Sequence, residues 1–137
     1  MKVKVVVDTN FLLLIARGVI APSNLNDVIN VSYELITTDA VVKELEAMSK
    51  EEDLLAREAR FALKLLDRLG VQVLRVEAGS ADKSILSLTK ALAQEGDRVV
   101  VATNDKNLRR SVRRLGVPTL YLREGSLKLE VDWNPLL

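Results

Sequence analysis

Five short runs rich in valine, isoleucine and leucine alternate with longer segments of helical periodicity, and this alternation constrains the fold more than any other feature. The runs predict strands, because β-branched residues between turn-forming residues favour extended chain. They cover residues 3–7, 34–38, 71–76, 98–102 and 119–123. Strands that alternate with helices form parallel sheets covered by helices. We therefore predict an α/β three-layer sandwich with a central, mainly parallel, five-stranded twisted sheet.

The segments between the runs carry apolar residues at every third or fourth position. The clearest stripe covers residues 55–69 and stops before Gly70, a residue type that favours the end of a helix. No linker or shift in composition divides the 137 residues, and this length suits one domain. We therefore predict a single domain over residues 1–137, in which alternating apolar residues in the tail 124–137 add an edge strand.

The chain contains no histidine and no cysteine. Their absence excludes serine–histidine and cysteine–histidine catalysis, histidine-ligated zinc, disulfides and iron–sulfur sites. Any catalysis must then depend on carboxylates, amides, hydroxyls, lysines, arginines or a cofactor. No apolar run reaches the roughly 20 residues that a membrane span needs, so we expect a soluble, cytoplasmic protein.

Acidic residues follow two of the predicted strands. Asp8 comes directly after the first run, and Asp105 follows the fourth in the string VVVATND. Ligands of open parallel sheets bind at the carboxyl ends of strands where the strand order reverses, so neighbouring strands would place both carboxylates in one crevice. The alternative is that each acid only caps the helix that follows it.

Two further acids lie near predicted helix starts. Asp82 lies in the first turn of a helix that begins after Ser80, where the helix dipole alone also favours a negative charge. Glu44 lies beside the apolar stripe of a helix that begins near Asp39, so it points either over the edge of the sheet or into solvent. Four carboxylates without histidine suit Mg²⁺ or Mn²⁺, which prefer oxygen ligands. Such an ion activates a water and stabilises the developing charge on a phosphate.

Four strings, in order, resemble the signatures of the PIN-domain nucleases: VVVDTNFLL, ITTDAVVKELE, SADKSILSLTKAL and VVVATNDKNLR. The resemblance covers the chain from residue 3 to about residue 123 and implies a Mg²⁺- or Mn²⁺-dependent endoribonuclease. Lys83 stands where many relatives carry a further acid, which leaves the number of metal ions open. The resemblance assigns as catalytic metal ligands Asp8, Glu44, Asp82 and Asp105, with Asn10, Thr103 and Asn104 as polar support.

The resemblance also implies partners. PIN domains often dimerise, which implies a homodimer. The segment 52–70 and the string DTNFLLL are similar to the archaeal and eukaryotic ribosome-biogenesis branch, which implies rRNA processing with a ribosome-assembly partner. The alternatives are a VapC-type toxin ribonuclease with an antitoxin partner, and a non-catalytic RNA-binding assembly module. A phosphoacceptor receiver domain would need an acidic pair after its first strand, where only Asp8 stands.

Residues 106–114, with the sequence KNLRRSVRR, combine a helical stripe with five cations. On a helix whose apolar side is formed by Leu108 and Val112, the cations flank the stripe. A basic helix directly after Asp105 could hold a phosphate backbone without reading sequence, although a solvated helix would show the same pattern. The predicted RNA-binding residues are Lys106, Arg109, Arg110, Arg113 and Arg114.

Overall fold

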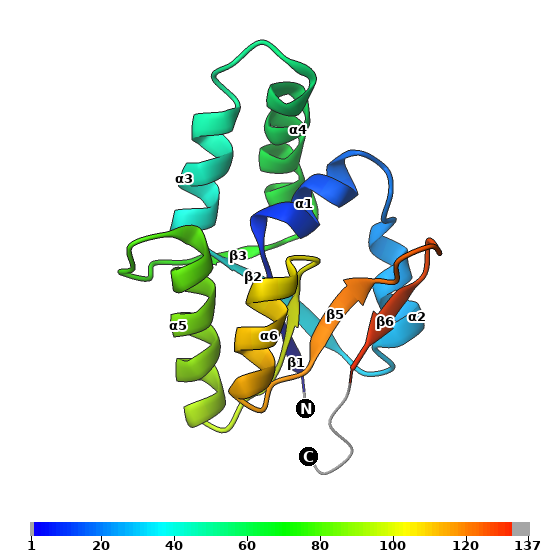
Figure 1. The fold of residues 1–137 in the computed structure, drawn as a ribbon, viewed down its shortest axis with the longest axis vertical. Helices are drawn as coiled ribbons and strands as arrows, with labels where there is room; N and C mark the ends of the chain where they lie inside the picture. Colours follow the sequence, from blue (N-terminus) through cyan, green and yellow to red (C-terminus); the bar gives the residue numbers. More distant parts are fainter. Residues whose placement is uncertain (1, 133–137) are drawn as a thin grey trace.

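The computed structural model describes residues 2–132, in which a six-stranded sheet is flanked by helices (Figure 1). The strands are β1 (Val3–Val7), β2 (Tyr33–Thr38), β3 (Gln72–Leu74), β4 (Arg98–Ala102), β5 (Thr119–Leu122) and β6 (Leu129–Val131). The helices are α1 (Thr9–Ala16), the 3-10 turn η1 (Pro22–Asn24), α2 (Leu25–Val28), α3 (Asp39–Met48), α4 (Leu54–Arg68), α5 (Ala81–Gln94) and α6 (Lys106–Arg114). The predicted α/β class with a mainly parallel sheet is confirmed.

The strand order is β3-β2-β1-β4-β5-β6, and every pair is parallel except β5 with β6. The prediction of five strands is therefore wrong by one. Residues 129–131 return beside β5 with Leu129 opposite Leu122. This strand lies in the tail 124–137, where alternating apolar residues predicted an edge strand. The alternation of strands with helices did not count it, because an antiparallel return needs only a short turn and no crossover helix. Residues 133–137 of the predicted tail lie outside the described part.

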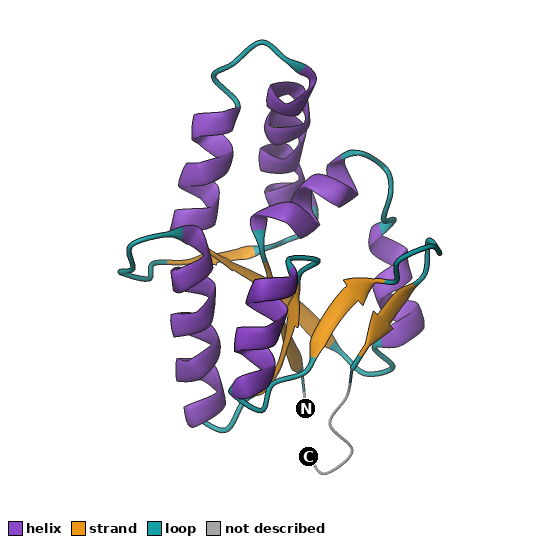
Figure 2. Ribbon diagram, in the orientation of Figure 1, coloured by secondary structure: helices purple, strands orange, loops and turns teal. Residues whose placement is uncertain are grey.

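The strand order reverses between β1 and β4. The chain moves outward from β1 to β3, and α5 then carries it back to β4 on the other side of β1. Right-handed crossovers in opposite directions place their helices on opposite faces of a sheet. Accordingly, α5 packs beside α6, whereas α1 packs against the hairpin formed by α3 and α4 (Figures 1 and 2).

The core lies around the central strand β1. Val3, Val5, Val6 and Val7 are each at most 1% exposed, as expected for a parallel strand covered on both faces. Asp8 comes directly after this run, so the fold places a carboxylate at the end of its most buried strand. Within residues 2–132, the helices are too short or too polar to cross a membrane.

Candidate functional site

Asp8 is buried at the carboxyl end of β1, with 3% of its surface exposed. It caps α1, and its Oδ1 accepts the backbone amide hydrogen of Phe11 at 2.8 Å. Its Oδ2 accepts the hydroxyl hydrogen of Thr103, the residue that follows β4. The capping alternative is therefore present, but the same carboxylate also bonds to the end of the neighbouring strand.

Thr103 connects Asp8 with Asp105. The Thr103 side chain is fully buried, and its Oγ1 accepts the backbone amide hydrogen of Asp105 at 3.0 Å. Asp105 caps α6, where its Oδ1 accepts the amide hydrogens of Asn107 at 2.8 Å and Leu108 at 3.0 Å. Both acids thus lie at the ends of adjacent strands, at the point where the strand order reverses.

Electrostatics link Asp82 to these two acids. The pKa of Asp8 is raised from 3.8 to about 7, chiefly by burial; hydrogen bonds from Thr103 and Phe11 lower it, and the carboxylates of Asp82 and Asp105 add to the rise. Burial and then the charge of Asp105 raise the pKa of Asp82. Repulsion of this kind requires short distances. The charges of Asp8 after β1, Asp82 in α5 and Asp105 before α6 therefore act on one another.

A buried pair of hydroxyls positions the helix that carries Asp82. Thr38 Oγ1 lies 2.7 Å from Ser84 Oγ, and both side chains are fully buried. The Ser84 hydroxyl donates to the carbonyl of Ala81 at 2.6 Å, so the hydrogen between the two hydroxyls comes from Thr38. Thr38 ends β2 and also caps α3, accepting the amide hydrogen of Val41 at 3.2 Å. The first turn of α5 is thereby attached to the carboxyl end of β2.

Glu44 is exposed in the second turn of α3. No hydrogen bond or ion pair within residues 2–132 joins it to the other acids, and in this part of the chain no group of three or more acidic side chains is close enough to enclose a metal ion. Because α3 begins at the end of β2, which neighbours β1, Glu44 follows the same edge of the sheet as Asp8. Its role stays a prediction.

The chemistry of the donors nevertheless fits a hard divalent cation. The carboxylates of Asp8, Asp82 and Asp105 would supply oxygen ligands. Burial, and after it the neighbouring carboxylates, raises the pKa values of Asp8 and Asp82, a cost that a bound cation would relieve. The hydroxyl of Thr9, next to Asp8, is buried and has no hydrogen-bond partner among the described residues. A buried polar atom without a partner marks a position that a water or ion completes.

The two asparagines assigned as polar support differ in their surroundings. Asn10 is exposed in the first turn of α1. The amide of Asn104 instead bonds to the end of β5, where Oδ1 accepts the amide hydrogen of Leu122 at 2.8 Å and Nδ2 donates to the Leu122 carbonyl at 3.2 Å. Asn104 therefore fixes the loop that contains Thr103 and Asp105 against β5.

The five cations of α6 differ in their surroundings. Arg109 and Arg113 form ion pairs with Asp132 at 3.6 and 3.5 Å, and the guanidinium of Arg109 lies 3.5 Å from the centroid of the Tyr121 ring. Asp132 also accepts the hydroxyl hydrogen of Thr119 at 2.7 Å, so it joins the end of β6 to the start of β5. Within the described chain, the cations of α6 outside any ion pair are Lys106, Arg110 and Arg114.

Sequence reasoning did not find Asp132 or Tyr121. The available signal was weak: Asp132 is an acid that follows an alternating apolar run in the tail, and nothing in its neighbours indicates a partner on α6. Only the antiparallel pairing of β6 with β5 brings it to Thr119 and Arg109.

A mainly parallel sheet with carboxylates at the ends of adjacent strands, where the strand order reverses, defines the class of this chain as an α/β domain with an acidic site at that edge of the sheet. Residues 5–125 match the family described as PIN like domain, and the chain belongs to that family. The resemblance found in the sequence is therefore confirmed.

Named relatives agree with this assignment. Ribonuclease VapC4 of Methanocaldococcus jannaschii is 28% identical over 123 residues, which cover 88% of this chain and 91% of the relative. Ribonuclease VapC9 of Archaeoglobus fulgidus is 34% identical over 127 residues, covering 87% and 82%. The solved structure of the PIN domain endonuclease Utp24 is similar with a TM-score of 0.74 and 25% identity, covering 96% of this chain and 92% of that one. The predicted class, a PIN nuclease, is confirmed.

Proposed function

We propose that this protein is a divalent-metal-dependent endoribonuclease that hydrolyses RNA phosphodiesters in the cytoplasm. One observation carries the proposal: Thr103 bonds to Asp8 and to the backbone of Asp105, and thus holds together two acids from adjacent strand ends. The charge of Asp82 acts on the same site, because it raises the pKa of Asp8. The names of the relatives, two ribonucleases and an endonuclease, support RNA as the substrate class and internal cleavage.

Asp8, Asp82 and Asp105 would hold Mg²⁺ or Mn²⁺, with Glu44 as the fourth predicted ligand. A bound ion of this kind supplies a water with a lowered pKa and neutralises charge on the phosphate. The reaction adds the water oxygen to phosphorus and breaks one bridging phosphorus–oxygen bond. Thr103 keeps Asp8 oriented through its hydroxyl, and the attachment of α5 to β2 keeps Asp82 at the same edge.

Substrate binding is expected to be chiefly electrostatic. Lys106, Arg110 and Arg114 are exposed on α6, which begins at Asp105. Cations in this position bind the phosphates of a strand that reaches the acids without reading its sequence. Arg109 and Arg113 also contribute positive charge to RNA binding, from the face of α6 on which both form ion pairs with Asp132.

The test compares the wild type with Asp8→Asn in Mn²⁺-dependent cleavage of single-stranded RNA. We expect cleavage by the wild type only, and a thermal stabilisation by Mn²⁺ that Asp8→Asn and Asp105→Asn both lack. Asp97→Asn is the matched control, because Asp97 pairs with Lys4 at 3.3 Å, away from the three acids. Full cleavage by folded Asp8→Asn would reject the assignment. Saturable RNA binding without cleavage or Mn²⁺ binding would instead support the non-catalytic alternative.

The biological role has two candidates, rRNA processing and a VapC-type toxin, and the names of the two ribonuclease relatives favour the second. A toxin is expected to arrest growth when expressed, to lose this effect in Asp8→Asn, and to copurify with a small protein encoded by a neighbouring gene. Light scattering would show whether the protein is the expected homodimer.

A further inference from the structure

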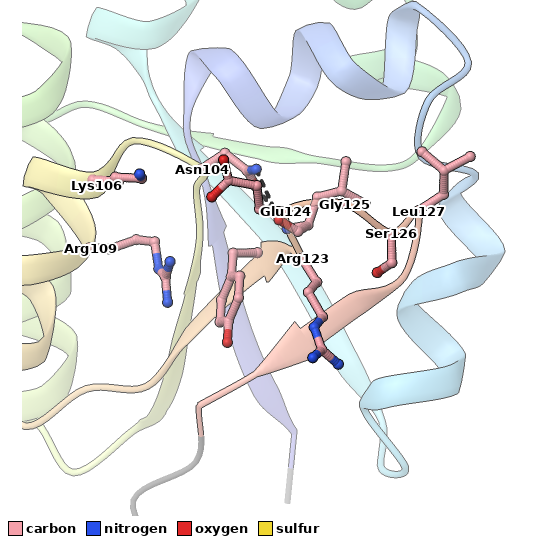
Figure 3. A pocket seen from close by; sticks show the side chains of 10 residues that line it. Asn104, Lys106, Arg109, Arg123, Glu124, Gly125, Ser126 and Leu127 are labelled. Atoms are coloured by element: carbon pink, nitrogen blue, oxygen red, sulfur yellow. Dashed lines mark hydrogen bonds between the residues drawn. The ribbon is translucent and has the colours of Figure 1, made fainter.

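A pocket with a volume of about 570 Å³ lies between α6 and the turn that joins β5 to β6 (Figure 3). This volume is within the range of about 300–1,000 Å³ that is typical of ligand sites. The pocket is far larger than a single ion needs; the proposed function uses Lys106 and Arg109 of its lining but assigns no ligand to the pocket itself. The residues on which its chemistry depends are Asn104, Lys106, Arg109, Tyr121, Arg123 and Leu127.

The pocket shares a wall with the candidate active site. Asn104 lines it and directly precedes Asp105. The two bonds between the Asn104 amide and the backbone of Leu122 fix this wall against the end of β5. An RNA strand that extends from Asp105 past Asn104 would therefore reach the pocket.

The lining is cationic on the side of α6. Figure 3 shows Lys106 and Arg109 extending from α6 toward the pocket. Within residues 2–132 the Lys106 ammonium forms no ion pair, whereas Arg123 at the rim pairs with Glu130 at 3.2 Å. Glu124 is the acid of the lining. An unpaired lysine beside a positioned arginine favours an anionic ligand.

Arg109 is held in place before any ligand arrives. Its Nε donates to Thr119 Oγ1 at 3.3 Å, its guanidinium stacks on the Tyr121 ring, and Asp132 lies 3.6 Å from one terminal nitrogen. A guanidinium has five N–H donors, so these contacts leave donors for a phosphate. On the opposite rim Leu127 is 77% exposed and offers apolar surface to a base or ribose.

We propose that this pocket binds the RNA strand on one side of the scissile phosphate. Lys106 and Arg109 bind a backbone phosphate there, and Tyr121 and Leu127 contact the nucleotide that carries it. The inference rests on the proposed ribonuclease function. It also distinguishes the cations of α6, because Lys106 and Arg109 face the pocket whereas Arg110 and Arg114 do not line it.

The test measures the affinity of the 137-residue protein for a labelled single-stranded oligoribonucleotide of about 12 nucleotides in EDTA, at several salt concentrations. Lys106→Gln is expected to weaken binding about three- to tenfold and to reduce the slope of log affinity against log salt by about 0.7, the value for one lost phosphate contact. Lys64→Gln, an exposed lysine on α4, is the matched control and is expected to change neither quantity. Equal binding by both variants would overturn the proposal.

A second measurement locates the ligand. Addition of the oligoribonucleotide is expected to shift the NMR amide signals of Gly125 and Asn104, which line the pocket. Absence of these shifts at saturation would overturn the proposal. Stronger binding of a polyglutamate peptide than of the oligoribonucleotide at this pocket would also overturn it, because the ligand would then be an acidic protein segment. If the wild type cleaves RNA but Lys106→Gln binds normally, the pocket and the role of Lys106 in RNA binding are rejected and the nuclease function stands. If Lys106→Gln weakens binding of RNA that the wild type never cleaves, the nuclease proposal fails and the pocket assignment survives.

Discussion

Thr103 donates its hydroxyl hydrogen to Oδ2 of Asp8, although 95 positions separate the two residues in the sequence. The bond exists because β1 and β4 are adjacent, with Val7 opposite Ala102. It orients a buried carboxylate that otherwise has only the Phe11 amide as a partner among the described residues. The predictions below test this relationship and the contacts around it.

Thr103→Val removes a hydrogen bond that lowers the pKa of Asp8, so this pKa is expected to rise above about 7. The amide of Asp105 also loses its acceptor, which destabilises the fold by about 1–3 kcal/mol. NMR titration of the Asp8 carboxyl carbon without metal measures the first effect. Thr89→Val is the control, because the Thr89 hydroxyl bonds to the Ile85 carbonyl within α5 and should not affect that titration.

Asp8→Asn is expected to be more stable than the wild type at pH 8. Between about pH 4 and pH 7 the folded wild type retains a proton on Asp8 that the unfolded chain has released, so its stability falls as pH rises through this window. The accumulated cost is at most about 4 kcal/mol above pH 7, and the amide variant avoids it. Thermal unfolding of both proteins from pH 4 to pH 8 measures the difference. A constant difference across this range would contradict the assignment of the raised pKa to Asp8.

Thr38→Val and Ser84→Ala are expected to act as one unit. The two hydroxyls are 2.7 Å apart and buried, so either substitution breaks the same bond. A double-mutant cycle on the free energy of unfolding should give a coupling of about 0.5–3 kcal/mol. If the two effects simply add, the hydroxyl pair does not attach α5 to β2.

Asp132→Ala is expected to destabilise the protein more than Asp97→Ala. Asp132 is 17% exposed and bonds to Thr119 as well as two arginines, so its loss leaves several partners unsatisfied, at a cost of about 1–3 kcal/mol. Asp97 forms a single, half-buried ion pair with Lys4 near the surface, the kind of contact worth about 0–1 kcal/mol. Urea unfolding of both variants makes the comparison, and equal losses would show that Asp132 is only a surface charge.

Glu44→Gln is expected to reduce cleavage by about 10- to 100-fold, the range seen when a group that supports a metal is removed. Because Glu44 is exposed, the thermal midpoint without metal should not change. Activity equal to that of the wild type would show that Glu44 does not serve the reaction. A lower midpoint would show instead that its role is structural.

The sequence by itself determined what depends on neighbouring residues. β1 and β4 have the predicted bounds, because β-branched runs favour extended chain whatever their partners are. The caps at Asp8 and Asp105 were likewise foreseen as an alternative, since a carboxylate after a strand bonds to amides two or three positions later.

Only the tertiary structure decided which of these local features meet. Strand order joins Thr103 to Asp8, the antiparallel return of β6 brings Asp132 to α6, and a buried hydroxyl pair attaches α5 to β2. Each contact spans residues far apart in the chain, and none leaves a periodic signal in the sequence around it. The physical reason is that periodicity and capping reflect short-range geometry, whereas the proximity of two side chains depends on how whole strands and helices pack.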